Sequence, residues 1–308
     1  MKTLHKKAIS AAAVALLSGL ACSSAFAADT PTNPEDAGSP IAANVTVASS
    51  YIYRGITQSN NKPAIQGGFD YAHDSGFYIG NWNSSISWIS DGYNSSGNTG
   101  VTRSAPSTSA PVEMDFYAGF KKELLGEGFA SDFGVLQYYY PTTGLGGIQP
   151  QSFVNANPSQ RQTAGTNPNT TELYVAQNFT AGPTTGFLKF SYAVSNLFGI
   201  ANSKGSFYPD LTVNYDTGLY GIALNAHVGY QYVPNNIVVA SGASAGTWNM
   251  SYADWKLGLT KDFGGGLSGT AYYTGTSAQK VGSTYVYATP NGGNAGRGNA
   301  VVALTKTF

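Results

Sequence analysis

The fold of this chain is decided by residues 112–121, which read VEMDFYAGFK. Every even position of this stretch is apolar, whereas the odd positions carry Glu, Asp, Tyr, Gly and Lys. A period of two is that of a β-strand, because successive side chains of a strand point to opposite faces. The stretch therefore has one apolar and one polar face. Similar alternation recurs from Asn44 onward, and helical spacing is nowhere sustained.

The alternating segments predict about twelve strands, an even number. The predicted strands are 44–56, 63–72, 76–89, 112–122, 129–140, 171–180, 186–196, 208–216, 218–232, 251–261, 266–276 and 298–308. Short turns near 73–76, 123–128, 181–185, 216–218 and 262–265 alternate with longer loops that include 90–111, 141–170, 233–250 and 277–297. Only the first outer connection, near 57–62, is expected to be brief.

The alternation of short turns with long loops favours a transmembrane β-barrel. Periplasmic turns of such barrels are tight, whereas extracellular loops are free to grow. A soluble β-sandwich shows the same period of two but has no reason to sort its connections by length. The sequence therefore predicts an all-β fold, an antiparallel transmembrane β-barrel with short periplasmic turns and long extracellular loops.

The composition agrees with a membrane barrel rather than with a soluble globular domain. Charged residues make up 10% of the chain, against roughly 25% in ordinary globular proteins. The 16 basic and 16 acidic residues leave no net charge, which excludes the electrostatic footprint of a nucleic-acid-binding protein. Beyond the N-terminus, no run of about 18 apolar residues could span a bilayer as a helix.

The N-terminus has the pattern of an export signal. Lysines precede a short apolar stretch at 8–20, and Ala-Phe-Ala at 25–27 gives the small-x-small pattern of signal peptidase sites. We therefore expect a signal peptide over 1–27, a flexible periplasmic lead-in over 28–43 and the barrel over 44–308. The only cysteine, Cys22, leaves with that peptide unless it carries the lipid of a lipoprotein; that chemistry wants a leucine three positions before the cysteine, where Gly19 stands.

The last residues, AVVALTKTF at 300–308, form an alternating strand that ends on Phe308. The pattern resembles the C-terminal strand that the outer-membrane barrel assembly machinery recognises, although Lys306 interrupts its apolar face. An ordinary closing strand is the alternative. Aromatic girdles at the two membrane interfaces are also expected, formed by Tyr51, Tyr53, Tyr78, Trp82, Trp88, Tyr139, Tyr220, Tyr230, Tyr232 and Trp255.

Residues 44–58 and 63–82 together resemble the start of the TorF family of porins, also called Gcw_chp proteins. Residues 113–120 and the closing 306–308 resemble the same family more loosely. The resemblance implies a proteobacterial outer-membrane barrel that conducts solutes, in a family whose substrate is poorly defined. The long loops at 90–111 and 141–170 contain no motif that can be carried over.

The polar strand faces are expected to line the lumen, because an Arg or Lys facing lipid near the midplane costs about 2–4 kcal/mol. The candidate lining residues are basic Arg54, Lys121, Lys189 and Lys256, acidic Asp70, Glu113, Asp115, Asp132, Glu172, Asp210 and Asp254, and the neutral Tyr117 and His227. The excess of acidic residues predicts a mild preference for cations in an open pore. The alternative is that these charges pair across the lumen and plug it.

Three residue sets are the first candidates for selectivity. Arg54 is expected to adjoin Asp70 on the neighbouring strand, and Glu113 and Asp115 to form a pair on one inward face. Glu172 is the third candidate. The sequence names no solute.

Catalysis, cofactors and metals are not expected. A barrel lipid hydrolase needs a Ser–His pair at the lipid-facing surface. His73 and Ser75 lie two positions apart, but Asp-Ser-Gly chemistry at 74–76 is suited to a turn, and His227 alternates onto the lumen side. The acidic residues do not fall in a calcium-loop spacing, and the glycine-rich stretches are not followed by a helix that would make a phosphate cradle.

These patterns together predict an outer-membrane, porin-like channel for passive diffusion of small hydrophilic solutes or ions. Two alternatives stay open: a plugged structural or adhesive barrel acting through its extracellular loops, and a barrel lipid hydrolase. Residues 141–170 either fold inward to narrow the pore or face outside. Expected partners are outer-membrane lipid and lipopolysaccharide, the assembly machinery and small solutes, but no nucleic acid; a homo-oligomer is left open.

Overall fold

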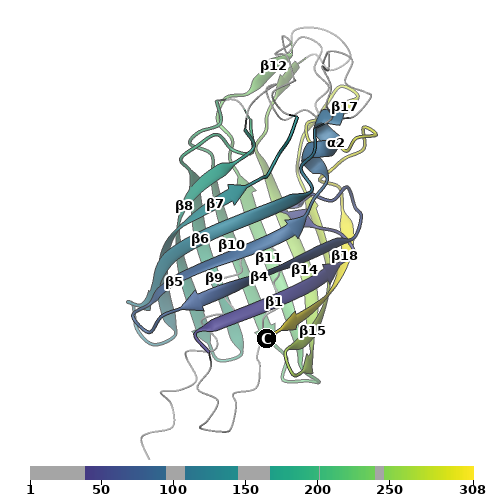
Figure 1. The fold of residues 1–308 in the computed structure, drawn as a ribbon. Coiled ribbons are helices and arrows are strands. Elements are labelled where there is room, and N and C mark those ends of the chain that lie inside the picture. The colour runs from purple at the N-terminus through teal and green to yellow at the C-terminus, as the bar shows by residue number, and fades with distance from the viewer. Residues whose placement is uncertain (1–38, 95–107, 145–166, 201, 240–245) are drawn as a thin grey trace, which may run out of the picture.

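The computed structural model describes residues 39–94, 108–144, 167–200, 202–239 and 246–308. Within them, twelve strands form one closed antiparallel barrel (Figure 1). These strands are β1 (Ile41–Ala48), β4 (Ala64–Ala72), β5 (Phe77–Ser85), β6 (Val112–Glu123), β7 (Phe129–Tyr139), β8 (Thr170–Ala181), β9 (Thr184–Ala193), β10 (Phe207–Asp216), β11 (Ile222–Gln231), β14 (Tyr252–Gly264), β15 (Leu267–Thr276) and β18 (Asn299–Thr307). The predicted all-β barrel and its even strand number are confirmed.

The first and last strands close the barrel. β1 pairs with β4 on one side and with β18 on the other, so that Val47 lies opposite Ile65 and opposite Leu304. Every other barrel strand pairs with its neighbours along the chain. β1 begins at Ile41 rather than at the expected Asn44. The expected signal peptide and most of the lead-in lie outside the described residues.

The connections differ in length at the two ends of the barrel, as predicted. At one end, here called the turn end, they are short: 73–76, 124–128, 182–183, 217–221 and 265–266. At the other, the loop end, they are 49–63, 86–111, 140–169, 194–206, 232–251 and 277–298. Figure 1 shows the loop end at the top and the C-terminus at the turn end. Most of the predicted long loops at 90–111 and 141–170 lies outside the described residues.

Two local predictions are wrong. β1 ends at Ala48, and the first outer connection is not a brief 57–62 but the whole of 49–63, which contains the short strands β2 (Ile52–Tyr53) and β3 (Ile56–Thr57). The prediction failed because a hairpin keeps the same period of two as one long strand. The chain also contains a short helix, α2 (Trp88–Asn94), within the predicted strand 76–89 and the loop after it.

Further short strands lie in the loop-end connections: β12 (Ile237–Val239) pairs with β13 (Gly246–Trp248), and β16 (Lys280–Val281) with β17 (Thr284–Tyr285). None of the helices in the described ranges is long and apolar enough to cross a membrane.

The outer surface of the barrel is apolar. On β6, Phe116 and Phe120 are 44% and 41% exposed, whereas the alternate residues Glu113, Asp115 and Tyr117 are buried. Every barrel strand exposes at least one large apolar or aromatic side chain in this way. This is the inverse of a water-soluble protein, in which burial of apolar side chains drives folding.

Inward tyrosines lie across glycines of neighbouring strands. A Cβ added at Gly80 would lie 2.4 Å from the ring of Tyr117, and one added at Gly229 would lie 2.1 Å from the hydroxyl of Tyr208. These strand glycines therefore leave the space in which the rings lie flat against the wall. Both hydroxyls end on carboxylates of the inner wall.

Four of the ten residues expected in aromatic girdles are exposed on the outer surface, and that they lie at membrane interfaces stays a prediction. Tyr139, Tyr230, Tyr232 and Trp255 are between 37% and 43% exposed on the outer surface. The other expected members do not lie on the outer wall of the barrel. Tyr220 lies in a turn, and Tyr51, Tyr78 and Trp82 are buried. Tyr53 and Trp88 pack against buried residues. The errors come from assigning a face by residue type instead of by position in the alternation.

Candidate functional site

The connection 49–63 folds into the barrel as a hairpin. β2 and β3 pair so that Tyr53 lies opposite Ile56, and the two residues between them, Arg54 and Gly55, have φ values of 45° and 75°. Both values are positive, as in the type I′ turns that favour tight hairpins. A Cβ added at Gly55 would lie 2.3 Å from Thr276 and 2.9 Å from Asp254, so the turn contacts the β14–β15 wall.

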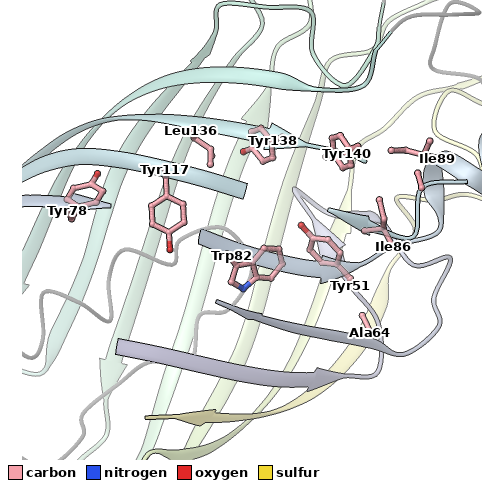
Figure 2. Packing of buried hydrophobic residues seen from close by; sticks show 11 residues of the cluster. Tyr51, Ala64, Tyr78, Trp82, Ile86, Ile89, Tyr117, Leu136, Tyr138 and Tyr140 are labelled. Atoms are coloured by element: carbon pink, nitrogen blue, oxygen red, sulfur yellow. The ribbon is translucent and has the colours of Figure 1, made fainter. Parts of the chain in front are cut away.

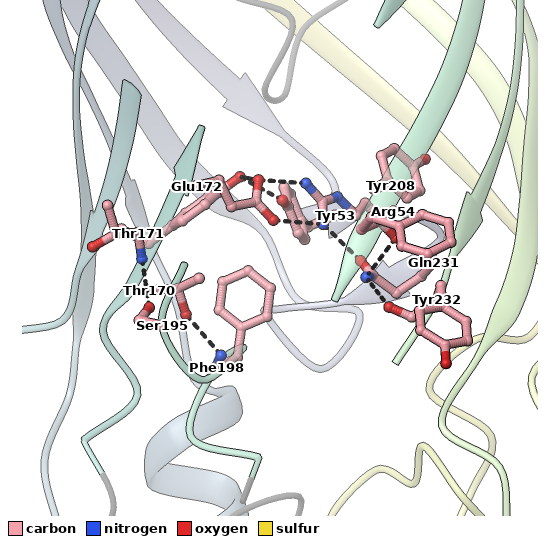
Figure 3. A network of polar contacts seen from close by, with 12 residues as sticks. Tyr53, Arg54, Thr170, Thr171, Glu172, Ser195, Phe198, Tyr208, Gln231 and Tyr232 are labelled. Atoms are coloured by element: carbon pink, nitrogen blue, oxygen red, sulfur yellow. Dashed lines mark hydrogen bonds and ion pairs between the residues drawn. The ribbon is translucent and has the colours of Figure 1, made fainter. Parts of the chain in front are cut away.

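Arg54, at the tip of this hairpin, is tied to two strands of the wall (Figure 3). Its Nη1 and Nη2 donate to the two carboxylate oxygens of Glu172 on β8 at 3.0 and 2.7 Å. Nη1 also donates to Oε1 of Gln231 on β11 at 2.6 Å. The ion pair is buried, with 7% and 1% of the two side chains exposed. Two parallel bonds fix direction as well as distance, which a Lys could not do.

Aromatic rings surround the Arg54 side chain. Its guanidinium carbon lies 4.9 Å from the ring centre of Tyr53 and 4.1 Å from that of Tyr208. The Tyr53 hydroxyl lies 2.5 Å from that of Tyr138, and both rings meet Phe198 edge to face. Phe198 comes from the connection 194–206, so two loop-end connections meet inside the barrel.

Two clusters of buried side chains flank the hairpin and fill the loop end. Tyr51 belongs to the first, with Trp82, Tyr138 and Tyr140 (Figure 2). Ile56 belongs to the second, which is built mainly from the connections 194–206, 232–251 and 277–298. Phe198 packs against both. In the described part of the chain, the loop end of the lumen is therefore occupied by side chains.

Tyrosine hydroxyls satisfy most of the inward carboxylates. Asp70 accepts from Tyr117 at 2.5 Å, Glu113 from Tyr51 at 2.5 Å and Tyr140 at 2.7 Å, Asp132 from Tyr78 at 2.6 Å, Glu172 from Tyr138 at 3.3 Å, and Asp254 from Tyr208 at 2.8 Å. A phenol donates a hydrogen bond without a positive charge. The tyrosines therefore hold these carboxyl groups in place without supplying a counter-charge of their own.

Two residues of the connection keep defined protonation states. Burial, followed by the charges of Glu113 and Asp115, raises the pKa of Tyr51 well above its usual value, so its hydroxyl stays protonated and donates. For Arg54, burial lowers the pKa, but the Glu172 carboxylate and the hydroxyls of Tyr53 and Tyr138 outweigh burial, and the net direction is upward. The guanidinium therefore remains charged at the hairpin tip.

The opposite wall carries a second polar network. His227 Nε2 lies 3.0 Å from Asp254 and 3.0 Å from the Tyr208 hydroxyl. Its Nδ1 lies 3.0 Å from Thr212 and 3.7 Å from Asp210. This histidine faces the lumen, away from the outer surface, as the alternation predicts.

The remaining lysines are distributed along the wall. Lys189 lies opposite Asp210 in the register, and its Nζ is 4.4 Å from the Tyr174 ring centre. Lys256 has its Nζ 5.3 Å from the ring centre of Tyr272. The buried Nζ of Lys121 makes no hydrogen bond with the described residues.

Most predicted lumen residues lie on inward faces, but their partners differ from those expected. Apart from Arg54, all of them alternate with the exposed apolar side chains of their strands. The expected pairing of Arg54 with Asp70 is wrong, because Arg54 sits on the hairpin rather than on a barrel strand and bonds to Glu172. Glu113 and Asp115 do share one face of β6. That these residues line a conducting path stays a prediction.

Sequence reasoning missed the residues that seat the hairpin. Gln231, Tyr138, Tyr208 and Phe198 belong to this site, and none was a candidate. Their positions in the alternation place the first three inward, but only the hairpin shows which inward residues meet. The one local signal was Gly55 after a β-prone segment, and Arg54 is not among the residues usual in such turns.

The described residues give little support to metal binding or to hydrolysis. No group of three or more His, Cys, Asp or Glu side chains there is arranged to hold a metal ion. His73 lies 2.9 Å from Ser75 in the exposed turn after β4, where the Ser75 backbone amide also donates to the imidazole. These are local turn contacts.

A family model described as "Bacterial protein of unknown function (Gcw_chp)" matches residues 32–308. The description contains the name Gcw_chp and not TorF, so the TorF part of the resemblance stays an expectation. No curated protein matches the sequence.

Solved structures with a similar fold include porins. The chain is similar to the KdgM porin with a TM-score of 0.47 and 6% identity, covering 87% of this chain and 99% of that one. It is similar to the NanC porin with a TM-score of 0.47 and 9% identity, covering 87% and 98%. A Pseudomonas aeruginosa FadL homologue gives a TM-score of 0.40 and 13% identity, covering 87% and 75%.

Proposed function

We infer the function of this chain, which belongs to the Gcw_chp family of bacterial proteins of unknown function, from its closed barrel and from the side chains that occupy the loop end of the lumen in the described residues. We propose an outer-membrane, porin-like channel for small hydrophilic solutes or ions, mildly cation-preferring and closed at rest by the β2–β3 hairpin.

The outer surface supports the membrane location. Side chains such as Leu257 and Val302, 59% and 60% exposed, lie in the middle of strands and would face water in a soluble protein. A closed barrel also leaves no unpaired strand edge, which is a requirement for β-structure in lipid. The aromatic side chains that remain outside, such as Trp255 and Tyr230, have the amphipathic character of interfacial residues.

One observation carries the proposal of a closed channel: an ion pair ties the hairpin to the wall. Relative to well-packed apolar side chains of similar volume, a buried ion pair gives little or no stability, because desolvation offsets the attraction. A permanent plug could therefore be apolar throughout. Arg54, Glu172 and Gln231 instead form a polar contact that water and ions can replace when the hairpin moves.

Cation preference is supported by the inward charges. The seven predicted inward acidic side chains outnumber the four predicted basic ones, Arg54, Lys121, Lys189 and Lys256. Since tyrosine hydroxyls hold most of these carboxylates, an opened lumen retains a negative field, and such fields favour cations.

The test is single-channel recording of the refolded protein in planar bilayers under a KCl gradient. Heat-modifiable migration on a gel first establishes that the barrel is folded. We expect infrequent openings of small conductance whose reversal potential leans toward that of K⁺. A folded barrel that never conducts, even when Arg54→Gln removes the ion pair between the hairpin and Glu172, would refute the proposed channel function.

A second candidate is a closed barrel that acts through its outer loops. The filled loop end, with its two buried clusters on either side of the hairpin, favours it. This candidate predicts silence of both the wild type and Arg54→Gln in bilayers, together with binding of the folded protein to a surface or partner.

A further inference from the structure

His227 lies on the inner wall between two carboxyl groups. Its Nε2 is 3.0 Å from Oδ1 of Asp254 on β14, and its Nδ1 is 3.7 Å from Oδ1 of Asp210 on β10. The His227 side chain is 14% exposed, against 2% for that of Asp254, so it is the member of this group that protons from the lumen reach. Imidazole is the side chain that ordinarily changes its charge between about pH 5 and 8.

A proton on His227 changes what its two ring nitrogens do. A neutral imidazole has one donor and one acceptor nitrogen, so Nε2 can donate to Asp254 while Nδ1 accepts from the Thr212 hydroxyl, 3.0 Å away. A protonated imidazole donates from both nitrogens and carries a positive charge. Since the second donor faces Asp210, both carboxyl groups then have a cation between them.

Tyr208 connects His227 with the tip of the β2–β3 hairpin. Its hydroxyl donates to Asp254 at 2.8 Å and lies 3.0 Å from Nε2 of His227. The tyrosine ring is inclined by only 23° to the imidazole, with 6.4 Å between the ring centres. The guanidinium carbon of Arg54 lies 4.1 Å from the centre of the same tyrosine ring (Figure 3). One ring therefore neighbours both the guanidinium and the imidazole.

The charges around His227 come from both neighbouring strands, from β9 and from the hairpin. Asp210 attracts Arg54 and Lys189 as well as a charged imidazole. A positive charge on His227 therefore competes with Arg54 for this attraction and adds a like charge to the same region, where repulsion is stronger than in water. The polar and charged groups that face His227 or its acidic partners are Tyr208, Asp210 and Thr212 on β10, Asp254 and Lys256 on β14, Lys189 on β9 and Arg54 on the hairpin.

We propose that protonation of His227 favours release of the β2–β3 hairpin from the wall, so that acid opens the barrel. The imidazolium adds a second cation beside Tyr208 and weakens the attraction between Asp210 and Arg54. The bidentate bond of Arg54 to Glu172 is not touched, so acid shifts the balance between the seated and released hairpin without abolishing the seated one. The proposal deepens the closed-channel function and rests on it, because release of the hairpin is the step that opens the proposed channel.

The test is hydrogen–deuterium exchange of the backbone amides of residues 49–63, which does not need conduction. The refolded protein in detergent is labelled at about pH 5.5 and 7.5, and peptides that cover the hairpin are read by mass spectrometry. We expect exchange in the wild type, after correction for the intrinsic rate, to be about fivefold faster at the lower pH. His227→Gln keeps a polar side chain that cannot be protonated, and it should abolish this acceleration. The matched control is His73→Gln in an exposed turn, which should respond as the wild type does.

Glu113, which accepts from Tyr51 of the same connection, is the rival source of an acid response. Equal exchange of the wild type at both pH values, or an acceleration that persists in His227→Gln, overturns the proposal. If His227→Gln fails to fold by gel migration, His227→Asn takes its place, and loss of the acceleration in Glu113→Gln would assign it to Glu113 instead. Acid release of the hairpin in a barrel that is silent in bilayers at both pH values would support the His227 switch and refute the channel. Conduction without acid release would do the reverse.

Discussion

At the scale of the residue, Arg54 combines backbone strain with a buried charge. Its φ of 45° lies in the left-handed region, where a non-glycine residue costs roughly 1 kcal/mol or more. The bidentate bond to Glu172 and the bond to Gln231 offset that cost in the seated position only. Under the proposed function, strain that is compensated only in the seated position favours release of the hairpin when those bonds are lost.

Cutting this contact should open the channel. In Arg54→Gln, Glu172 loses both guanidinium bonds and keeps only its 3.3 Å bond from Tyr138, and removing one partner of a buried pair costs roughly 3–5 kcal/mol. We expect the open probability in planar bilayers to rise severalfold. Arg297→Gln, an exposed arginine in a loop-end connection, is the matched control and should behave as the wild type. Equal open probabilities in Arg54→Gln and Arg297→Gln would mean that this ion pair does not hold the lumen closed.

At the scale of the element, the barrel strands were predictable and the hairpin was not. Alternation over about ten residues fixes a strand and its outward face, because lipid and lumen impose opposite polarity on the two sides. Residues 49–57 satisfy the same alternation while folding inward. The one local sign of the turn is Gly55, and it is weak because Arg54 before it is not a residue usual in such turns.

For the residues around the hairpin, the sequence likewise predicts the face of a strand but not the contacts between strands. The alternation placed Asp70, Glu113, Asp115 and Glu172 inward, which the structure shows. It could not give the partner of Glu172, since Arg54 is 118 positions away along the chain. Contacts across a lumen depend on the closed barrel, so sequence spacing carries no signal for them.

The hairpin turn itself can be tested at Gly55. In Gly55→Ala the new Cβ would clash with Thr276 and Asp254 as well as sit at positive φ. We expect the hairpin to be displaced, with a higher open probability and a lower heat-modification temperature on gels. The control is Gly292→Ala, whose φ of 78° is similar but whose Cβ would meet nothing within 4 Å. Equal effects of the two substitutions would assign the result to backbone strain and not to the contact with the wall.

At the scale of the whole molecule, the lumen carries an uneven distribution of charge. Asp132→Asn combined with Asp210→Asn removes two inward negative charges while leaving the hairpin tie in place. We expect the reversal potential of the open channel under a KCl gradient to move toward that of a non-selective pore. Asp74→Asn with Asp216→Asn, both exposed at the turn end, is the matched control. If only this control pair shifted selectivity, the field would have to originate at the mouth instead of in the lumen.

The exposed apolar side chains of the barrel strands predict that a charge placed among them destabilises the protein. Leu257→Arg places a charge in the middle of β14, where lipid contact makes it cost about 2–4 kcal/mol. Leu219→Arg, in the turn after β10, should cost far less, because the side chain lies outside the apolar band. Unfolding in urea from phospholipid vesicles measures both. Equal losses would argue against a bilayer around β14.

The closure of β1 on β18 also sets an order of events during assembly. β1 and the hairpin leave the ribosome first, whereas Glu172 and Gln231 are 118 and 177 positions downstream of Arg54, and β18 comes last. The first strand must keep one edge unpaired until the final strand arrives, and contacts between such distant segments form slowly. A chain that stalls before β18 would therefore expose both the free edge of β1 and, at the hairpin tip, a charge that the closed barrel buries.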